Sequence, residues 1–249
     1  MAEVSPLMVD IAELKAANER RWAVAKPTRN FISIAKSLVA AKSRYVAVQN
    51  RTGVPWYFIA IVHEREADQK WNTQLGQGDP LNQVSVHEPK GRGPFATWVD
   101  GAVDALVRCP PYAAHNTDWS IGGLLTEFEQ YNGLGYAMKD LPSPYVWAGT
   151  DQYVKGKYAS DGVYNPNLID QQPGCAPLLI CMEALDHSIV VGDPIIIMPE
   201  SPSIVPDTKP IGTGSSHPAS LDGPSITNPA KGSIGAAIAN LFAAIFRRK

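Results

Sequence analysis

The stretch from Val54 to Glu66 constrains this chain most, because it predicts a helix that is apolar on nearly every face. Pro55 fits the first turn of a helix, where its missing N–H is not needed. The residues from Trp56 to Val62 then leave no polar side to face water. Such a helix belongs at the centre of a protein, so we expect the rest of the chain to pack around it.

The end of this helix is charged, which conflicts with burial. Helical spacing places Glu66 on the stripe of Ile59 and His63, and turns Glu64 roughly 200° away from Glu66. Burial raises the pKa of a carboxyl group, so Glu66 is a candidate general acid near neutral pH. The alternative is that these charges are simply solvated at a helix C-terminus.

Proline divides the chain. Apolar patterning continues to about residue 190, which is long enough for a substantial core. We therefore expect one domain over residues 1–190. Residues 191–231 are rich in Pro, Ser and Gly, a composition typical of a linker. Residues 232–249 form a third segment.

Composition excludes several classes. The net charge of −2 gives no broad basic field, so nucleic acid is not an expected partner. Residues 1–21 are polar and acidic where a signal peptide needs an apolar run, so ordinary secretion is not indicated. Three scattered cysteines, Cys109, Cys175 and Cys181, are too few for a disulfide scaffold or a zinc site. We expect reduced thiols, with one pair and one odd thiol as the alternative.

The expected fold class is α+β and predominantly α-helical, with long loops. Apolar spacing predicts helices over 9–26, 30–50, 97–108, 118–130 and 176–186, besides the helix that carries Glu66. Asp118 is the expected N-cap of its helix. Glycine and proline predict a loop or short β-hairpin over 70–95 and another loop over 131–173.

The second of these loops is aromatic. Its rings alternate with amides and carboxylates, a combination that suits sugars: ring faces cover C–H surface while polar groups bind hydroxyls. The alternative is that the rings only pin the loop to the domain. The aromatic residues are Tyr131, Tyr136, Tyr145, Trp147, Tyr153, Tyr158 and Tyr164.

Several motifs together resemble a known family. They are Val-Pro-Trp at 54–56, His-Glu-Arg-Glu at 63–66, Gln-Gly-Asp-Pro-Leu at 77–81, Tyr-Asn-Gly-Leu-Gly-Tyr at 131–136, Ser-Pro-Tyr-Val-Trp at 143–147 and Gly-Lys-Tyr at 156–158. Over roughly residues 30–187 the chain resembles bacterial and phage lysozyme-family proteins. These are similar to goose-type lysozymes and lytic transglycosylases of the lysozyme superfamily.

The resemblance implies a lysozyme-like domain that cleaves the β-1,4 bond between N-acetylmuramic acid and N-acetylglucosamine in peptidoglycan. In it Glu66 takes the place of the catalytic acid, and Tyr131-Asn132 resembles the pair that lines the saccharide cleft of transglycosylases. Glu64 has no counterpart. The chain lacks the Gly-Leu-Met-Gln segment that follows the glutamate in transglycosylases, which leaves residue roles in the loop over 71–95 open.

Hydrolysis needs a second group, and Asp79 is the candidate, since it follows Gly76 and Gly78 in a loop able to cover a cleft. The alternative for Asp79 is a turn residue before Pro80. Without a second carboxylate, a lytic transglycosylase is expected, in which the substrate's own 6-hydroxyl attacks. A non-catalytic glycan-binding protein is the remaining alternative.

The expected substrate contacts are His63, Tyr131, Asn132, Tyr136, Tyr145 and Trp147. No metal or other cofactor is expected. A His-Glu-x-x-His zinc motif would need histidine at position 67, where Ala67 stands. A structural, hydrogen-bonded histidine is the favoured interpretation of His63.

The last segment, 232–249, has apolar residues at helical spacing and ends in Arg247-Arg248-Lys249. About 15 apolar or small residues precede the arginines, against roughly 20 needed to cross a bilayer. An amphipathic helix at an anionic membrane surface is therefore expected, with docking on a protein as the alternative. The implied setting is a phage endolysin, made in the cytoplasm and acting on the cell wall in the periplasm after release, or a virion-associated hydrolase.

Overall fold

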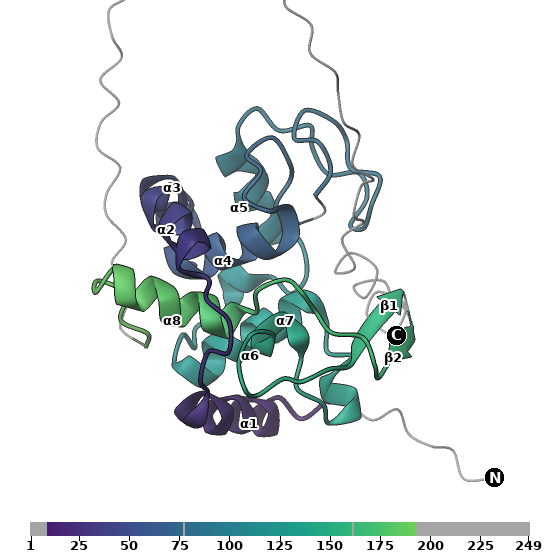
Figure 1. Cartoon of the computed structure of the whole chain (residues 1–249). Helices are drawn as coiled ribbons and strands as arrows, with labels where there is room; N and C mark the ends of the chain where they lie inside the picture. The colour runs from purple at the N-terminus through teal and green to yellow at the C-terminus, as the bar shows by residue number, and fades with distance from the viewer. Residues whose placement is uncertain (1–8, 77, 161, 193–249) are drawn as a thin grey trace, which may run out of the picture.

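The computed structural model describes residues 9–76, 78–160 and 162–192, and helices dominate this part of the chain (Figure 1). Helix α4 (Trp56–Ala67) lies at the centre, as its apolar sequence predicts. Every residue of α4 except Glu66 is buried. The helix ends at Asp68, whose left-handed backbone (φ 49°) turns the chain into the loop that follows.

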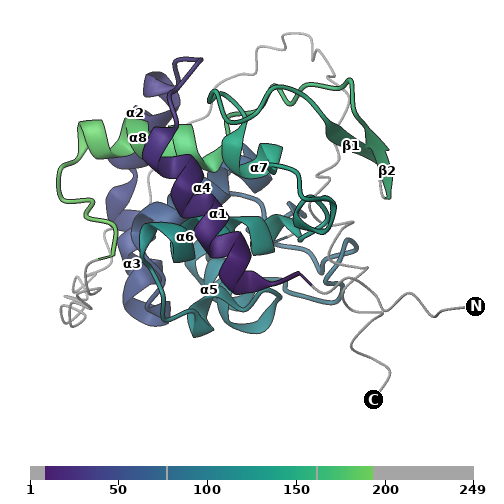
Figure 2. The ribbon, with the colours of Figure 1, turned by 90° about the horizontal axis from the view of Figure 1, so that it is seen from below.

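Five helices surround α4 and share one hydrophobic core with it. They are α2 (Ile32–Ala40), α3 (Lys42–Thr52), α5 (Trp98–Arg108), α6 (Ile121–Asn132) and α8 (Cys175–Leu185). Outside this layer, α1 (Ile11–Val24) packs against α6, and Figure 2 shows it lying across α6 when the molecule is seen from below. The predominantly helical class is therefore confirmed.

Two details of the predicted helices were wrong. The helix expected over 30–50 is two helices, since the chain turns at Ala41 between α2 and α3. The N-cap of α6 is Ser120, whose hydroxyl accepts a hydrogen bond from the Gly123 N–H. Asp118 instead accepts hydrogen bonds from Ser120 and pairs with Lys15 of α1 at 2.6 Å. Asp118 therefore joins α1 to the start of α6.

The two long loops differ from each other. Within its described residues, the 70–95 segment has no helix or strand, only an isolated bridge between Thr73 and Pro80. The β-hairpin lies instead in the second loop, where β1 (Lys157–Ser160) pairs antiparallel with β2 (Val163–Asn165). That loop also contains the four-residue helix α7 (Pro144–Trp147). Short 3-10 turns, η1 (Ala113–His115) and η2 (Ala137–Lys139), complete the architecture.

The proposed linker and C-terminal helix, residues 191–231 and 232–249, fall almost entirely outside the described residues. Within the part of the chain that is described, no helix is long and apolar enough to cross a bilayer. Cys109, Cys175 and Cys181 are all free thiols.

Candidate active site

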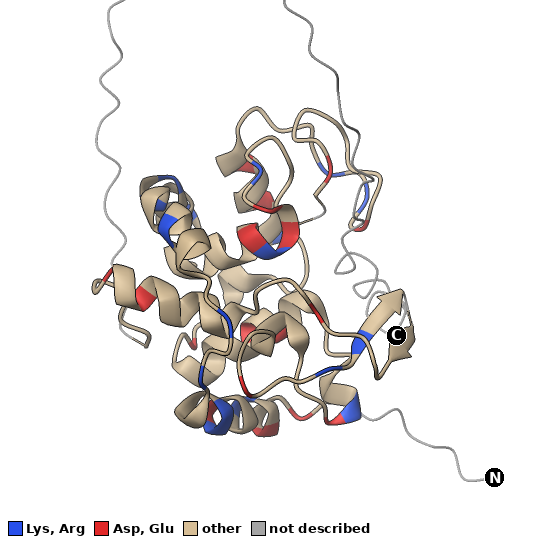
Figure 3. Ribbon diagram, in the orientation of Figure 1, with Lys and Arg blue, Asp and Glu red and all other residues tan. Residues whose placement is uncertain are grey.

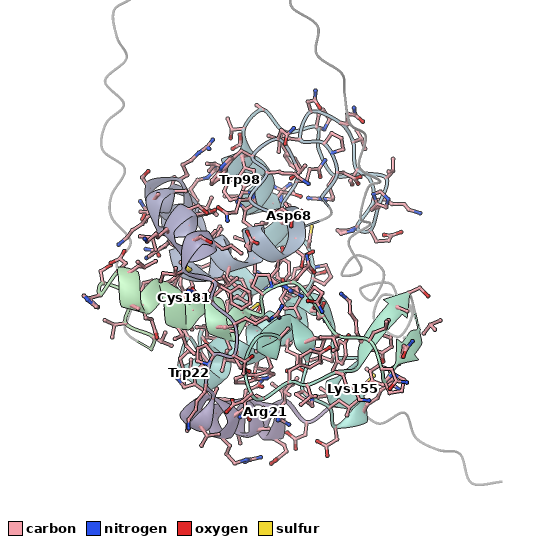
Figure 4. The ribbon with its side chains drawn as sticks, in the orientation of Figure 1. Arg21, Trp22, Asp68, Trp98, Lys155 and Cys181 are labelled. Atoms are coloured by element: carbon pink, nitrogen blue, oxygen red, sulfur yellow. The ribbon has the colours of Figure 1, made fainter. Side chains whose placement is uncertain are left out.

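The candidate site is built on the last turn of α4. Figure 3 shows the charged residues of this turn at one end of an otherwise uncharged helix. In Figure 4, the label of Asp68, which caps α4, marks this end of the helix. Glu66 is the only partly exposed residue of α4, and its Oε1 accepts a hydrogen bond of 2.8 Å from the hydroxyl of Tyr145. Tyr145 comes from α7, so tertiary packing fixes the orientation of this carboxylate.

Arg65 holds α7 and the hairpin segment against this turn. Its guanidinium lies over the Tyr145 ring, 4.5 Å from the centroid, and donates to the Pro173 carbonyl at 2.9 Å. It also pairs with buried Asp170 at 3.4 Å, and Lys157 of β1 pairs with the same carboxylate at 2.7 Å. Burial opposes ionisation of Asp170, but the charges of Arg65 and Lys157 outweigh it and lower its pKa.

Glu64 faces a different part of the protein, as the helical phase predicts. Its Oε2 accepts a 2.8 Å hydrogen bond from the Gln69 amide, and its charge acts on Tyr45 of α3. Burial raises the pKa of Glu64. Glu64 and Glu66 thus have separate partners although they are two residues apart.

The loop that carries Asp79 passes beside Glu66. A Cβ atom added to Gly78 would lie 3.6 Å from the Glu66 carbonyl oxygen, so the loop backbone contacts the last turn of α4. The Asp79 carboxylate itself is buried and accepts three hydrogen bonds, from the backbone N–H groups of Val86 (2.9 Å) and His87 (3.0 Å) and from His87 Nδ1 (2.7 Å). Burial opposes its ionisation, but the bonds from His87 and Val86 prevail and lower the pKa of Asp79. Asp79 therefore organises its loop, and its catalytic role stays a prediction.

His63 lies in the core rather than at a surface that a sugar can reach. Its ring is fully buried between Trp71 and Trp98, with centroids 4.5 and 4.6 Å away. The Lys70 carbonyl, 3.0 Å from Nε2, can only accept, so Nε2 carries the proton and Nδ1 accepts from the Tyr45 hydroxyl at 3.0 Å. Both nitrogens are used inside the fold, so we do not retain His63 as a substrate contact.

Tyr131 and Asn132 are the last two residues of helix α6, and their side-chain polar groups are available to a ligand. Tyr131 is half-buried, and its ring meets the edge of Phe58 of α4 at 6.1 Å. Burial and then the charge of Glu66 raise its pKa, which places the phenol near that carboxylate. Within the described residues, neither the Tyr131 hydroxyl nor the side-chain amide of Asn132 makes a hydrogen bond. Both remain candidate substrate contacts.

Three other predicted contacts hold the fold together instead. Trp147 is fully buried, so it offers no face to a ligand. Tyr136 is also buried. Its hydroxyl accepts a hydrogen bond of 3.1 Å from the Tyr158 N–H, which joins β1 to the segment that follows α6. Tyr145 is only 3% exposed and holds Glu66 rather than presenting its ring to a sugar. The positions of these three rings agree with the alternative interpretation, in which they pin the loop to the domain.

Glu127 is a residue that the sequence analysis missed. It lies one helical turn before Tyr131, is 5% exposed, and has one carboxyl oxygen, Oε1, without a hydrogen-bond partner. Gln130 donates to the other oxygen at 3.3 Å. Burial raises the pKa of Glu127 to about 7, and its charge also acts on Tyr131. The four-residue spacing to Tyr131 was the available signal, since such residues share a helix face.

No group of three or more potential metal ligands occurs among residues 9–76, 78–160 and 162–192. Comparison with known protein families, with characterised proteins and with solved structures gave no match.

Proposed function

We propose that this protein cleaves the β-1,4-glycosidic bonds of peptidoglycan through a lysozyme-like domain, with Glu66 as the general acid. One observation carries the proposal: Glu66 is the single residue of the central helix that is partly exposed, and a hydroxyl from another element orients its carboxyl group. A charged residue that ends a buried helix and is positioned in this way is typical of a functional site rather than of a solvated helix end.

The chemistry follows from this placement. Cleavage of a glycosidic bond passes through an oxocarbenium-like transition state, and the departing oxygen must receive a proton. Glu66 supplies it, because an acid held by Tyr145 keeps a fixed direction toward the bond. Tyr131, whose phenol lies near Glu66, and its neighbour Asn132 bind sugar hydroxyl or acetamido groups.

The second step distinguishes two products. A muramidase uses a carboxylate to direct water, and Asp79 is the candidate for that role. The three hydrogen bonds that hold Asp79 within its own loop favour the other route, lytic transglycosylation. There the ionised Glu66 removes the proton of the substrate's 6-hydroxyl, the oxygen bonds to the anomeric carbon, and a 1,6-anhydro sugar results.

The test is mass spectrometry of the fragments released from purified peptidoglycan. Hydrolysis gives reducing muramic ends, transglycosylation gives ends lighter by one water, and the absence of fragments refutes the enzymatic proposal in favour of a glycan-binding protein. Glu66→Gln keeps the shape and removes the acid, so the rate should fall by about 10²- to 10⁴-fold. Glu64→Gln is the matched control, since Glu64 faces Gln69 and Tyr45. Equal activity of Glu66→Gln and wild type would remove Glu66 from the mechanism.

The proposal includes the setting. The chain acts on the bacterial cell wall as an endolysin or a virion-associated hydrolase, with residues 232–249 at the membrane surface. Its partner is the glycan strand and not nucleic acid.

A further inference from the structure

A cavity of about 470 Å³ lies on the side of the molecule where α1 packs against α6. This volume is within the range of small-molecule sites. Its walls come from α1 and the residues just before it, from Glu129, from the segment 137–142 and from Gln152. They combine an apolar surface with polar and charged side chains, and the apolar surface includes Leu14, Ala17, Met138, Leu141 and Pro142. Glu66, Tyr131 and Tyr145 do not line it. The cavity is thus separate from the candidate active site.

The most buried polar groups of the cavity are Glu129 of α6 and Asn18 of α1. The other polar side chains that line it are Asp10, Glu13, Arg20, Arg21, Asp140 and Gln152. Glu129 is only 1% exposed, and its Oε1 has no hydrogen-bond partner. Its Oε2 has only a long contact of 3.5 Å with Asn18 Nδ2, which is closer to the Thr126 hydroxyl at 3.2 Å. Buried carboxyl oxygens are normally satisfied by donors, so this one lacks a donor that a ligand can supply.

Arg20 pairs with Glu13 at 2.8 Å, and Arg21 is the other cation of the cavity lining. It lines the same cavity from α1, where Figure 4 labels it, and it is more exposed than Glu129. Its guanidinium makes no hydrogen bond or ion pair with any described residue, although its charge is felt by Glu129. The cavity therefore combines a buried negative group, an apolar wall and a more exposed positive group.

We propose that this cavity binds a small zwitterion of the ω-amino acid type. Its primary ammonium group contacts Glu129 and Asn18, its aliphatic stem lies along Leu14, Met138 and Leu141, and its carboxylate pairs with Arg21. An ammonium group supplies several donors, which suits a carboxylate with an unsatisfied oxygen. The proposal does not depend on the proposed glycosidase activity.

The proposal is tested by calorimetric titration of the full-length protein with 6-aminohexanoate and with hexanoate at pH 8. We expect saturable binding of 6-aminohexanoate at one site and at least tenfold weaker binding of hexanoate, which lacks the ammonium group. Affinity should fall about tenfold between pH 8 and pH 6, because burial raises the pKa of Glu129 to about 7 and protonation removes its charge.

Variants identify the site. Glu129→Gln should weaken 6-aminohexanoate binding at least tenfold while the melting temperature stays at or above that of wild type. Glu127→Gln is the matched control on the same helix, since Glu127 is also buried but does not line the cavity, and it should bind normally. Equal binding of the two probes, undiminished binding by Glu129→Gln, or no binding at millimolar 6-aminohexanoate would each overturn the proposal. Normal binding by Glu66→Gln would separate this site from the catalytic one.

Discussion

The hydroxyl of Tyr145 lies 2.8 Å from Oε1 of Glu66, and this bond joins two elements that are 79 residues apart in the chain. The Tyr145 ring is itself held by the guanidinium of Arg65, the residue before Glu66. The candidate acid is therefore positioned by a ring that its own helix helps to fix.

Tyr145→Phe should keep the ring under Arg65 and remove only the hydrogen bond to Glu66. A hydroxyl that donates to a carboxylate stabilises the ionised form, so without it Glu66 keeps its proton to higher pH. We expect a lower rate on peptidoglycan and a basic limb of the pH–rate profile that moves upward. An unchanged profile would show that Tyr145 has no part in positioning the acid.

Tyr131 is expected to contact the glycan through its hydroxyl, which makes no hydrogen bond within the described fold. Tyr131→Phe should therefore weaken binding to insoluble peptidoglycan while leaving the melting temperature unchanged. Tyr136→Phe provides the contrast, because the Tyr136 hydroxyl accepts from the Tyr158 N–H and its loss should reduce stability. Sedimentation binding assays and thermal unfolding of both variants check the pair.

His63 should make the protein acid-sensitive. Burial lowers its pKa from 6.5 to about 4, so the unfolded chain takes up a proton between these pH values and the folded protein does not. The stabilisation is complete above pH 6.5 and is lost as the pH falls through 4. The shift corresponds to roughly 3 kcal/mol of unfolding free energy. Urea unfolding from pH 7 to 4 should show this slope, and His63→Gln should flatten it.

Glu127 should change stability with pH in the direction opposite to His63. Burial raises its pKa from 4.5 to about 7, so the folded protein holds this proton longer than the unfolded chain. The contribution of Glu127 to the free energy of unfolding is fully present below pH 4.5 and is lost as the pH rises through 7. Glu127→Gln should therefore gain stability over wild type at pH 8, by up to roughly 3 kcal/mol, and little at pH 4. A difference that does not depend on pH would contradict this assignment.

The segment after residue 191 is expected to govern location and not chemistry. Truncation after Val191 removes none of the proposed site residues, so cleavage of lipid-free peptidoglycan should be retained. Binding to anionic vesicles should fall sharply, because Arg247, Arg248 and Lys249 each contribute about 1 kcal/mol near a charged surface, and this contribution weakens with salt. Equal vesicle binding by both forms at low salt would remove the membrane role.

The sequence alone determined the central helix and the separation of its two glutamates. Both follow from local rules: an apolar segment has to be buried, and residues two positions apart on a helix point in different directions. The same rules predicted the predominantly helical class. They did not predict the break between α2 and α3, since nothing at Ala41 is a strong helix breaker.

Only the tertiary structure decided which polar and aromatic residues have unused groups. Asp79 is engaged by His87, His63 by Tyr45 and Lys70, and Tyr136 by the hairpin, whereas the polar groups of Tyr131 and Asn132 are left over. Tertiary packing also pairs Tyr145 with Glu66 and buries the carboxyl group of Glu129 beside α1. Residue type and spacing fix what a side chain is able to bind. Its actual partner depends on contacts between segments far apart in the chain, which periodicity does not encode.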